Sequence, residues 1–198
     1  TFLHFGFRFI FCCKTAKILS LAAQFLLIAL FCSAQITSSA TMKNAVVTGA
    51  NRGLGLELCK QLAEGDLYSS VYALCRKTTE ELNQLASKSP KIKVVEGVEV
   101  TKDDAVTVLQ ETFHTQVQPV PIHLLVHNAG GYGPPEGSIT DYKSQSLDNI
   151  TTERMRYAFD LNTVAPLMLT KALVPNLEVV GSSTDGPAKV VIISSAMG

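Results

Sequence analysis

The sequence lacks the features that identify several classes of protein. Only 17% of its 198 residues are charged, lysine plus arginine equal aspartate plus glutamate at 17 each, and no run of basic residues occurs after residue 41. A net charge of zero without a basic patch argues against nucleic acid as a partner. The hydrophobic fraction of 46% excludes a disordered chain and a coiled coil. This length predicts one globular domain with a real core.

Cysteine is scarce and does not form a framework. Three of the five cysteines lie in the first 41 residues, which leaves Cys59 and Cys75 for the rest of the chain. The sequence has no Cys-x-x-Cys pair and no histidine-rich spacing, so it predicts no metal site. We expect Cys59, on a helix, and Cys75, at the end of a strand, to be free and mostly buried thiols.

Acidic residues are absent from residues 1–41. Lys14 and Lys17 precede an uncharged, mostly apolar stretch at residues 18–32, and small residues follow up to a plausible cleavage position after Ala34. This order is typical of a signal peptide. The apolar stretch is shorter than the about 20 residues of a membrane span.

Three interpretations of this leader remain open. It is a signal peptide for the secretory pathway, an uncleaved membrane anchor, or upstream sequence that is absent from a cytoplasmic mature protein beginning near Met42. The membrane is a partner only if residues 18–32 are an uncleaved anchor. In each case we expect the folded domain at residues 42–198.

The most informative stretch is a glycine-rich turn between an apolar run and a helical pattern. Residues 45–47 are apolar, residues 48–55 read Thr-Gly-Ala-Asn-Arg-Gly-Leu-Gly, and leucines recur every fourth residue at Leu54, Leu58 and Leu62. This order predicts a buried strand, a tight turn and an amphipathic helix. Glycines let the backbone approach a bound group, and the free N–H groups of the first helical turn suit a phosphate. The stretch therefore predicts a nucleotide site.

Strand and helix patterns alternate along the rest of the domain. We expect a helix that Thr101 caps and whose buried stripe is Val106, Leu109, Phe113 and Val117. Further strands are expected at residues 70–76, 92–96, 121–126 and 188–193, the last of them buried, and further helices at residues 80–88 and 152–174. This alternation predicts an α/β fold, a doubly wound parallel sheet with helices on both faces.

The glycine spacing Thr48-Gly49-x-x-x-Gly53-x-Gly55 resembles the cofactor turn of the classical short-chain dehydrogenase/reductases. His127-Asn128-Ala129-Gly130 is similar to the family's Asn-Asn-Ala-Gly, with histidine in place of the first asparagine. The resemblance covers about residues 42–198 and is strongest to carbonyl reductases of the sniffer and C-factor type. It implies the strand order 3-2-1-4-5.

The end of the second strand indicates which cofactor is used. In dinucleotide folds an acidic residue here binds the ribose 2′-hydroxyl and selects NAD. Here Arg76 and Lys77 end the strand and Arg52 lies in the glycine turn, which suits the 2′-phosphate of NADP(H). The alternative is that Arg76 and Lys77 only solvate the strand end.

The resemblance implies a set of cofactor-binding residues, in which Glu99 takes the place of an aspartate that touches the adenine. The set comprises Thr48, Gly49, Asn51, Arg52, Gly53, Leu54, Gly55, Arg76, Glu99, Val100, Asn128, Ala129 and Gly130.

Two residues match the family's catalytic positions. Pro166 has no N–H to bond the Asn162 carbonyl, which is therefore available to hold a water. In the family this water lies on the proton relay to a catalytic lysine. Ser195, the second of paired serines after the last strand, matches the serine that orients the substrate carbonyl. The sequence places no serine or cysteine beside His127, so we do not predict that His127 is catalytic.

No tyrosine in the sequence has a lysine four residues later, although Tyr-x-x-x-Lys is the family's acid–base centre. We expect an incomplete sequence of an NADP(H)-dependent oxidoreductase that transfers hydride between nicotinamide and a carbonyl or hydroxyl carbon. The alternative is a catalytically inactive protein that binds NADP(H) or a partner. The implied partners are a small-molecule carbonyl or alcohol substrate and, through the helix containing Asn162, a second copy of the chain.

Overall fold

The computed structural model describes residues 42–114, 118–132, 146–181 and 186–194. The predicted leader, residues 1–41, and the predicted catalytic Ser195 lie outside the described residues. Nothing in the structure therefore tests those two predictions.

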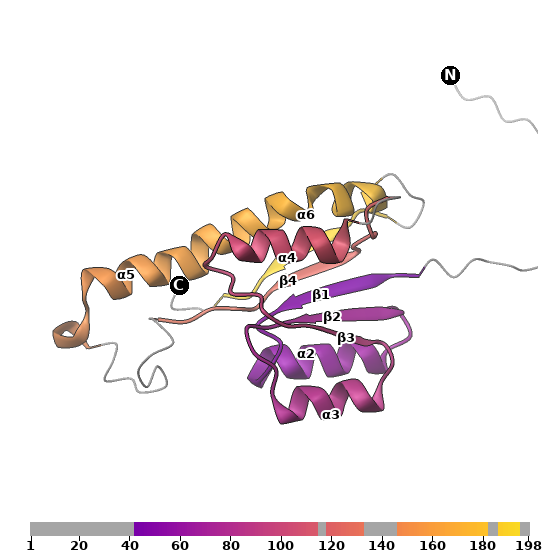
Figure 1. Ribbon diagram of the computed structural model, residues 1–198, viewed down its shortest axis with the longest axis horizontal. Coiled ribbons are helices and arrows are strands. Elements are labelled where there is room, and N and C mark those ends of the chain that lie inside the picture. The colour runs from indigo at the N-terminus through magenta and orange to yellow at the C-terminus, as the bar shows by residue number, and fades with distance from the viewer. Residues whose placement is uncertain (1–41, 115–117, 133–145, 182–185, 195–198) are drawn as a thin grey trace, which may run out of the picture. The chain divides into compact units, whose positions relative to one another are not determined.

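A five-stranded parallel sheet forms the centre of the domain (Figure 1). Its strand order is β3-β2-β1-β4-β5 and every neighbouring pair is parallel, which confirms the predicted fold and order. The strands are β1 (Asn44–Thr48), β2 (Ser70–Leu74), β3 (Ile92–Val95), β4 (Leu124–His127) and β5 (Lys189–Ile192).

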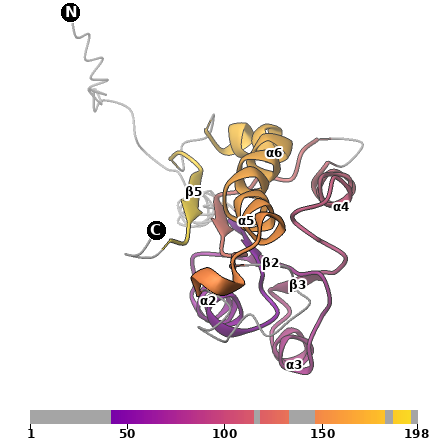
Figure 2. The same ribbon diagram turned by 90° about the vertical axis from the view of Figure 1, so that its left-hand side faces the viewer.

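Helices cover both faces of this sheet, as Figure 2 shows in a view along the strands. On one face lie α2 (Gly53–Glu64) and α3 (Glu80–Lys88). On the other lie α4 (Asp104–Phe113) and a long helical run. The run comprises α5 (Thr152–Phe159), the π-helical turn η3 (Asp160–Val164) and α6 (Ala165–Gly181), and a short 3-10 helix, η2 (Leu147–Asn149), precedes it.

The strand register brings the ends of the strands together. All five residues of β1 are buried, because β1 pairs with both β2 and β4. Thr48 lies opposite Leu74, Leu74 lies opposite Val95, and β4 ends at His127 beside them. We call this end the carboxyl edge of the sheet. Ligands bind at this edge in open parallel sheets.

Helix α2 buries a different stripe from the predicted one. Leu54 is 55% exposed, whereas Gly55, Cys59 and Ala63 are buried against the sheet. Small residues on the inner side let the helix approach the strands closely, which turns the leucines toward the flanks. Leu58 is one of these flanking leucines and is only partly buried against the core.

The prediction that Thr101 caps the next helix is wrong. Helix α4 begins at Asp104, its N-cap residue Asp103 makes no side-chain cap bond, and Thr101 Oγ1 lies 3.1 Å from Glu99 Oε1 instead. The helix buries Ala105, Leu109 and Phe113, while Val106 is only half-buried. The predicted Val117 lies outside the described residues.

The long helical run extends past its predicted end at residue 174, to Gly181, with Pro175 inside it. Asn176, the residue after this proline, ties the run to the chain around the end of α4, because its Nδ2 donates to the carbonyls of Phe113 and Val120, at 2.9 Å each. Among the described helices this run alone is long and apolar enough to cross a membrane by length and composition. Its Leu169 and Leu173 belong to the core, as expected of a core helix.

Strand β5 is exposed, although its sequence predicts a buried strand. Val190, Val191 and Ile192 are 43%, 40% and 59% exposed. The strand pairs with β4 along one side, and the described helices leave its faces largely uncovered. The apolar run therefore predicted the strand correctly, but the prediction that the strand is buried is wrong.

Candidate functional site

The predicted glycine turn lies at the carboxyl edge, between β1 and α2. Gly49 and Gly53 have φ angles of +65° and +55°, which favour glycine. A Cβ atom on Gly49 would lie 2.9 Å from the Ala129 Cα, and one on Gly55 would collide with the Gly49 carbonyl oxygen. A Cβ on Gly53 would meet no atom of the described residues within 4 Å. The turn is thus packed tightly toward the protein and open beside Gly53.

Hydrogen bonds join this turn to the end of β4. The Thr48 hydroxyl, which is 1% exposed, accepts the N–H groups of Asn128 and Ala129 at 3.1 and 3.0 Å. In return, Asn128 Nδ2 donates to the carbonyls of Thr48 and Gly49, both at 3.1 Å. The predicted glycine turn and the predicted segment after β4 are therefore joined by hydrogen bonds.

The first turn of α2 is available to a bound anion. Its N-cap residue, Arg52, is exposed and supplies no side-chain cap bond. Helix α3 differs, because its N-cap Thr79 accepts the Leu82 N–H. Gly53 is the first residue of α2, and a Cβ added to it would meet no described residue within 4 Å. Unpaired N–H groups at the start of a helix suit phosphate.

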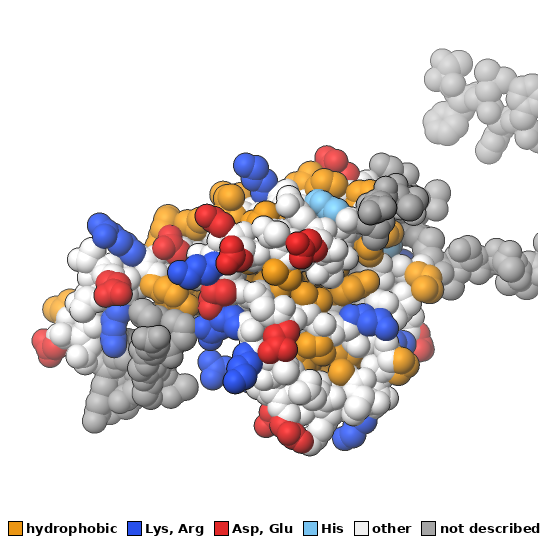
Figure 3. All heavy atoms as spheres, viewed as in Figure 1, with side chains coloured by type: hydrophobic (Ala, Val, Ile, Leu, Met, Phe, Trp, Pro, Cys, Tyr) orange, Lys and Arg blue, Asp and Glu red, His pale blue; other side chains and the backbone are white. Residues whose placement is uncertain are grey.

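Bonds between loops hold the basic residues near the turn. Asn51 Nδ2 donates to the Lys77 carbonyl at 3.0 Å, and Thr79 Oγ1 donates to the Asn51 carbonyl at 2.6 Å. This brings Arg52, Arg76 and Lys77 to the same edge. On the face seen in Figure 3, blue side chains gather where the strands end, with red side chains close by.

One acidic residue pairs with a predicted phosphate-binding cation. Arg76 Nη1 lies 3.2 Å from Glu99 Oε2. Val100, beside Glu99, packs against the core under α4. Glu99 was predicted to contact adenine; the structure places it beside Arg76, and the adenine contact stays a prediction.

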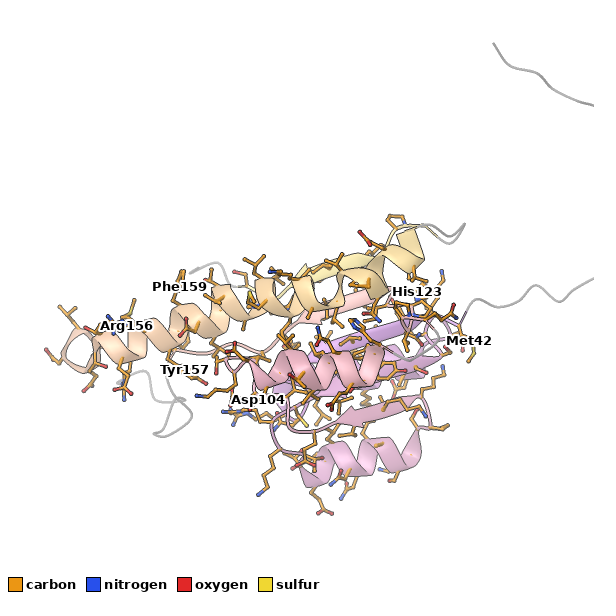
Figure 4. The ribbon with its side chains drawn as sticks, turned by 45° about the horizontal axis from the view of Figure 1, so that its top comes forward. Met42, Asp104, His123, Arg156, Tyr157 and Phe159 are labelled. Atoms are coloured by element: carbon orange, nitrogen blue, oxygen red, sulfur yellow. The ribbon has the colours of Figure 1, made fainter. Side chains whose placement is uncertain are left out.

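Sequence reasoning missed Tyr157, which lies next to this ion pair. Burial raises the pKa of Tyr157, and the Glu99 carboxylate raises it further, while Arg76 and a side-chain hydrogen bond with Thr101 lower it. Figure 4 shows Tyr157 on the side of α5 that faces the beginning of α4, near Asp104. No local motif marks this tyrosine, because its neighbours are distant in the sequence.

His127 links β4 to α6. It is 2% exposed, and its Nε2 lies 2.8 Å from the Thr170 hydroxyl. That hydroxyl donates its proton to the Pro166 carbonyl at 2.7 Å, so His127 Nε2 carries the hydrogen of the pair. Burial lowers the pKa of His127 to about 4, so the ring is neutral at pH 7. This arrangement supports a bracing role.

Asn162 occupies the π-helical turn and grips the loop after β4. Its Nδ2 donates to the carbonyls of Gly131 and Ala158, at 2.8 Å each, and its Oδ1 accepts the Gly131 N–H at 3.1 Å. The Ala165 N–H bonds Asp160, and Pro166 has no N–H. The carbonyls of Leu161 and Asn162 therefore both lose their usual donor four residues ahead. The sequence predicted one such carbonyl, and the π-turn adds a second.

The remaining candidates for reactive chemistry are structural. Among the described residues, no group of three or more His, Cys, Asp or Glu side chains could hold a metal ion. Cys59 and Cys75 are free and buried, as predicted. Burial, with Cys75 as a second cause, raises the pKa of Cys59 to about 12, which keeps this thiol protonated and unreactive.

A parallel sheet in this order, with a glycine turn at the carboxyl end of β1, is a Rossmann-type fold. The family model for short chain dehydrogenase matches residues 43–198. The chain therefore belongs to the short-chain dehydrogenase family of oxidoreductases.

Several relatives show the same likeness. Short chain dehydrogenase yanD of Aspergillus niger is 30% identical over 165 residues, which cover 78% of this chain and 46% of that protein. The NADPH-bound carbonyl reductase from chicken fatty liver has a TM-score of 0.63 at 29% identity, covering 78% of this chain and 57% of that one. The Sniffer protein of Caenorhabditis elegans has a TM-score of 0.61 at 27% identity, covering 78% of this chain and 63% of that one. The chain thus spans about half the length of its relatives.

Proposed function

We propose that this chain contributes the cofactor site of an NADP(H)-dependent oxidoreductase, which transfers hydride between nicotinamide and a carbonyl or hydroxyl carbon of a small molecule. The observation that carries the proposal is the open, uncapped start of α2 beside Gly53, with Arg52 and Arg76 at the same edge. The chicken carbonyl reductase, which has this fold and was crystallised with NADPH, supports the choice of cofactor.

The residues at the carboxyl edge fit such a cofactor. The first turn of α2 would hold the pyrophosphate, Arg52 and Arg76 the 2′-phosphate, and Val100 the adenine. When bound, the cofactor supplies or accepts the hydride. Thr48 and Asn128 keep the site in shape by fixing the glycine turn to β4.

Two further residues complete the proposal for this chain. The Asn162 carbonyl has no donor from Pro166, and the bonds of the Asn162 side chain to Gly131 keep the residue in place. This carbonyl holds a water that passes a proton. Ser195 orients the substrate carbonyl. The sequence contains no Tyr-x-x-x-Lys, so the proposal for these 198 residues concerns binding and positioning.

The test is to replace both Arg52 and Arg76 with alanine. Loss of charge-assisted bonds to the 2′-phosphate is expected to raise the Kd of NADPH about 30-fold or more. The Kd of NADH, which has no such phosphate, should change less than about threefold by the same reasoning. Fluorescence titration of the chain with each cofactor measures both values.

A charge-matched control is the K88A/K171A double variant. Both lysines are exposed on helix surfaces, and their loss changes the net charge by the same amount. The control should bind both cofactors as the unsubstituted chain does. Equal weakening of NADPH and NADH in the arginine variant would contradict the preference for NADP(H).

A further inference from the structure

The segment after β3 is built to hold Glu99 beside Arg76. Gly97 has a φ of +84°, and its N–H donates to the Arg76 carbonyl at 3.2 Å. The next N–H, of Val98, donates to the Cys75 carbonyl at 3.0 Å. These main-chain bonds fix the chain after β3 alongside the end of β2. The Arg76–Glu99 pair is therefore a consequence of the backbone path.

The Glu99 carboxylate is held at both oxygens. Oε2 faces Arg76 Nη1 at 3.2 Å, and Oε1 accepts the Thr101 hydroxyl at 3.1 Å. The Glu99 side chain is 28% exposed, compared with 45% for Arg76. Two donors and partial burial hold the carboxylate beside Arg76 at this edge.

This position matters because charge at the end of β2 distinguishes the two nicotinamide cofactors. An acidic group there accepts the ribose 2′-hydroxyl of NAD, whereas cations bind the 2′-phosphate of NADP. In this chain the strand end supplies the cation, Arg76, and the neighbouring loop supplies an acid, Glu99. Both kinds of charge are thus present at one place.

We propose that Glu99 is a specificity-determining residue, which lowers the preference for NADPH by acting as the counter-ion of Arg76 and lets NADH bind at the same site. The proposal rests on the proposed function. A 2′-phosphate must share the Arg76 guanidinium with a carboxylate of like charge, which weakens its binding. The neutral 2′-hydroxyl of NADH meets no such repulsion and can donate a hydrogen bond to the carboxylate.

The E99Q variant tests this role. Glutamine keeps the size of the side chain and an acceptor for Thr101 but removes the charge. The Kd of NADPH is expected to fall about three- to tenfold at low salt, and the Kd of NADH to stay the same or rise, because only the phosphate is repelled by a carboxylate. Titration of both cofactors at two ionic strengths measures the ratio, whose change should shrink as salt rises.

The matched control is E96Q. Glu96 also follows β3, and the E96Q substitution removes the same charge as E99Q. The Glu96 carboxylate accepts the Thr78 N–H at 3.2 Å instead of pairing with Arg76. The ratio of the two Kd values should change clearly less in E96Q than in E99Q. Equal changes in both variants would mean that the effect comes from the net charge and not from the position of Glu99, which would overturn the proposal.

Two other results are also decisive. Binding of both cofactors with an unchanged ratio, or weaker binding of NADPH in E99Q, would show that Glu99 does not oppose the phosphate and would overturn its role alone. Failure of the unsubstituted chain to bind either cofactor would overturn the proposed function, and the role of Glu99 with it.

Discussion

Replacing Gly55 with alanine is expected to lower the free energy of unfolding by about 3 kcal/mol or more and to abolish binding of the cofactor. The new Cβ would collide with the Gly49 carbonyl oxygen and lie 2.5 Å from Asn128 Nδ2. Neither group can retreat without breaking the bonds of Asn128 to Thr48 and Gly49. Urea unfolding followed by circular dichroism measures the loss.

Gly65 supplies the matched control at the other end of α2. Its φ is −73°, and an added Cβ would lie 3.6 Å from the Gln61 carbonyl oxygen, an ordinary contact. The G65A variant should therefore stay within about 1 kcal/mol of the unsubstituted chain. If G55A and G65A are equally stable, the close packing of α2 on the turn is not what requires glycine at position 55.

Acid is expected to destabilise the domain through His127. Its pKa is about 4 in the folded chain and 6.5 when unperturbed. Because the folded pKa is the lower one, the unfolded chain binds the proton more readily, and stability present above pH 6.5 is lost as pH falls toward 4. The two pKa values correspond to a loss of about 3 kcal/mol, measured as the unfolding free energy against pH.

The H127N variant separates this loss from the titration of surface carboxylates. Asparagine does not titrate and still offers a hydrogen-bond donor to Thr170. Between pH 6.5 and 4 its stability should fall less steeply than that of the unsubstituted chain. Parallel curves for the two proteins would mean that His127 is not the group that takes up the proton.

The sequence predicted the fold because its signals are local. Apolar runs bounded by turns mark the strands, and the alternation with helices determines a parallel sheet. Helix α3 was predicted at its observed bounds, Glu80–Lys88. The family resemblance assigned Thr48 and Asn128 to one cofactor site, and the structure joins these two residues by a hydrogen bond.

Most features that the sequence did not predict depend on packing or on contacts that no local pattern shows. The inner stripe of α2 is set by how closely Cys59 and Ala63 let the helix approach the sheet, not by where leucines recur. The π-turn at Asp160–Val164 changes the register of a helix that the sequence shows as continuous. The Arg76–Glu99 pair joins residues 23 apart along the chain, through a turn at Gly97 that no nucleotide motif marks.

The hydrogen bonds between Thr48 and Asn128 affect when the site forms during folding. The two residues are 80 positions apart, so the glycine turn acquires its partners only after a long loop has closed. Closing such a loop costs entropy before any contact offsets it, and contacts of this span slow folding. Although its sequence motif is short, the glycine turn becomes rigid only after β1 and β4 have paired. It should therefore be among the last parts of the domain to become rigid.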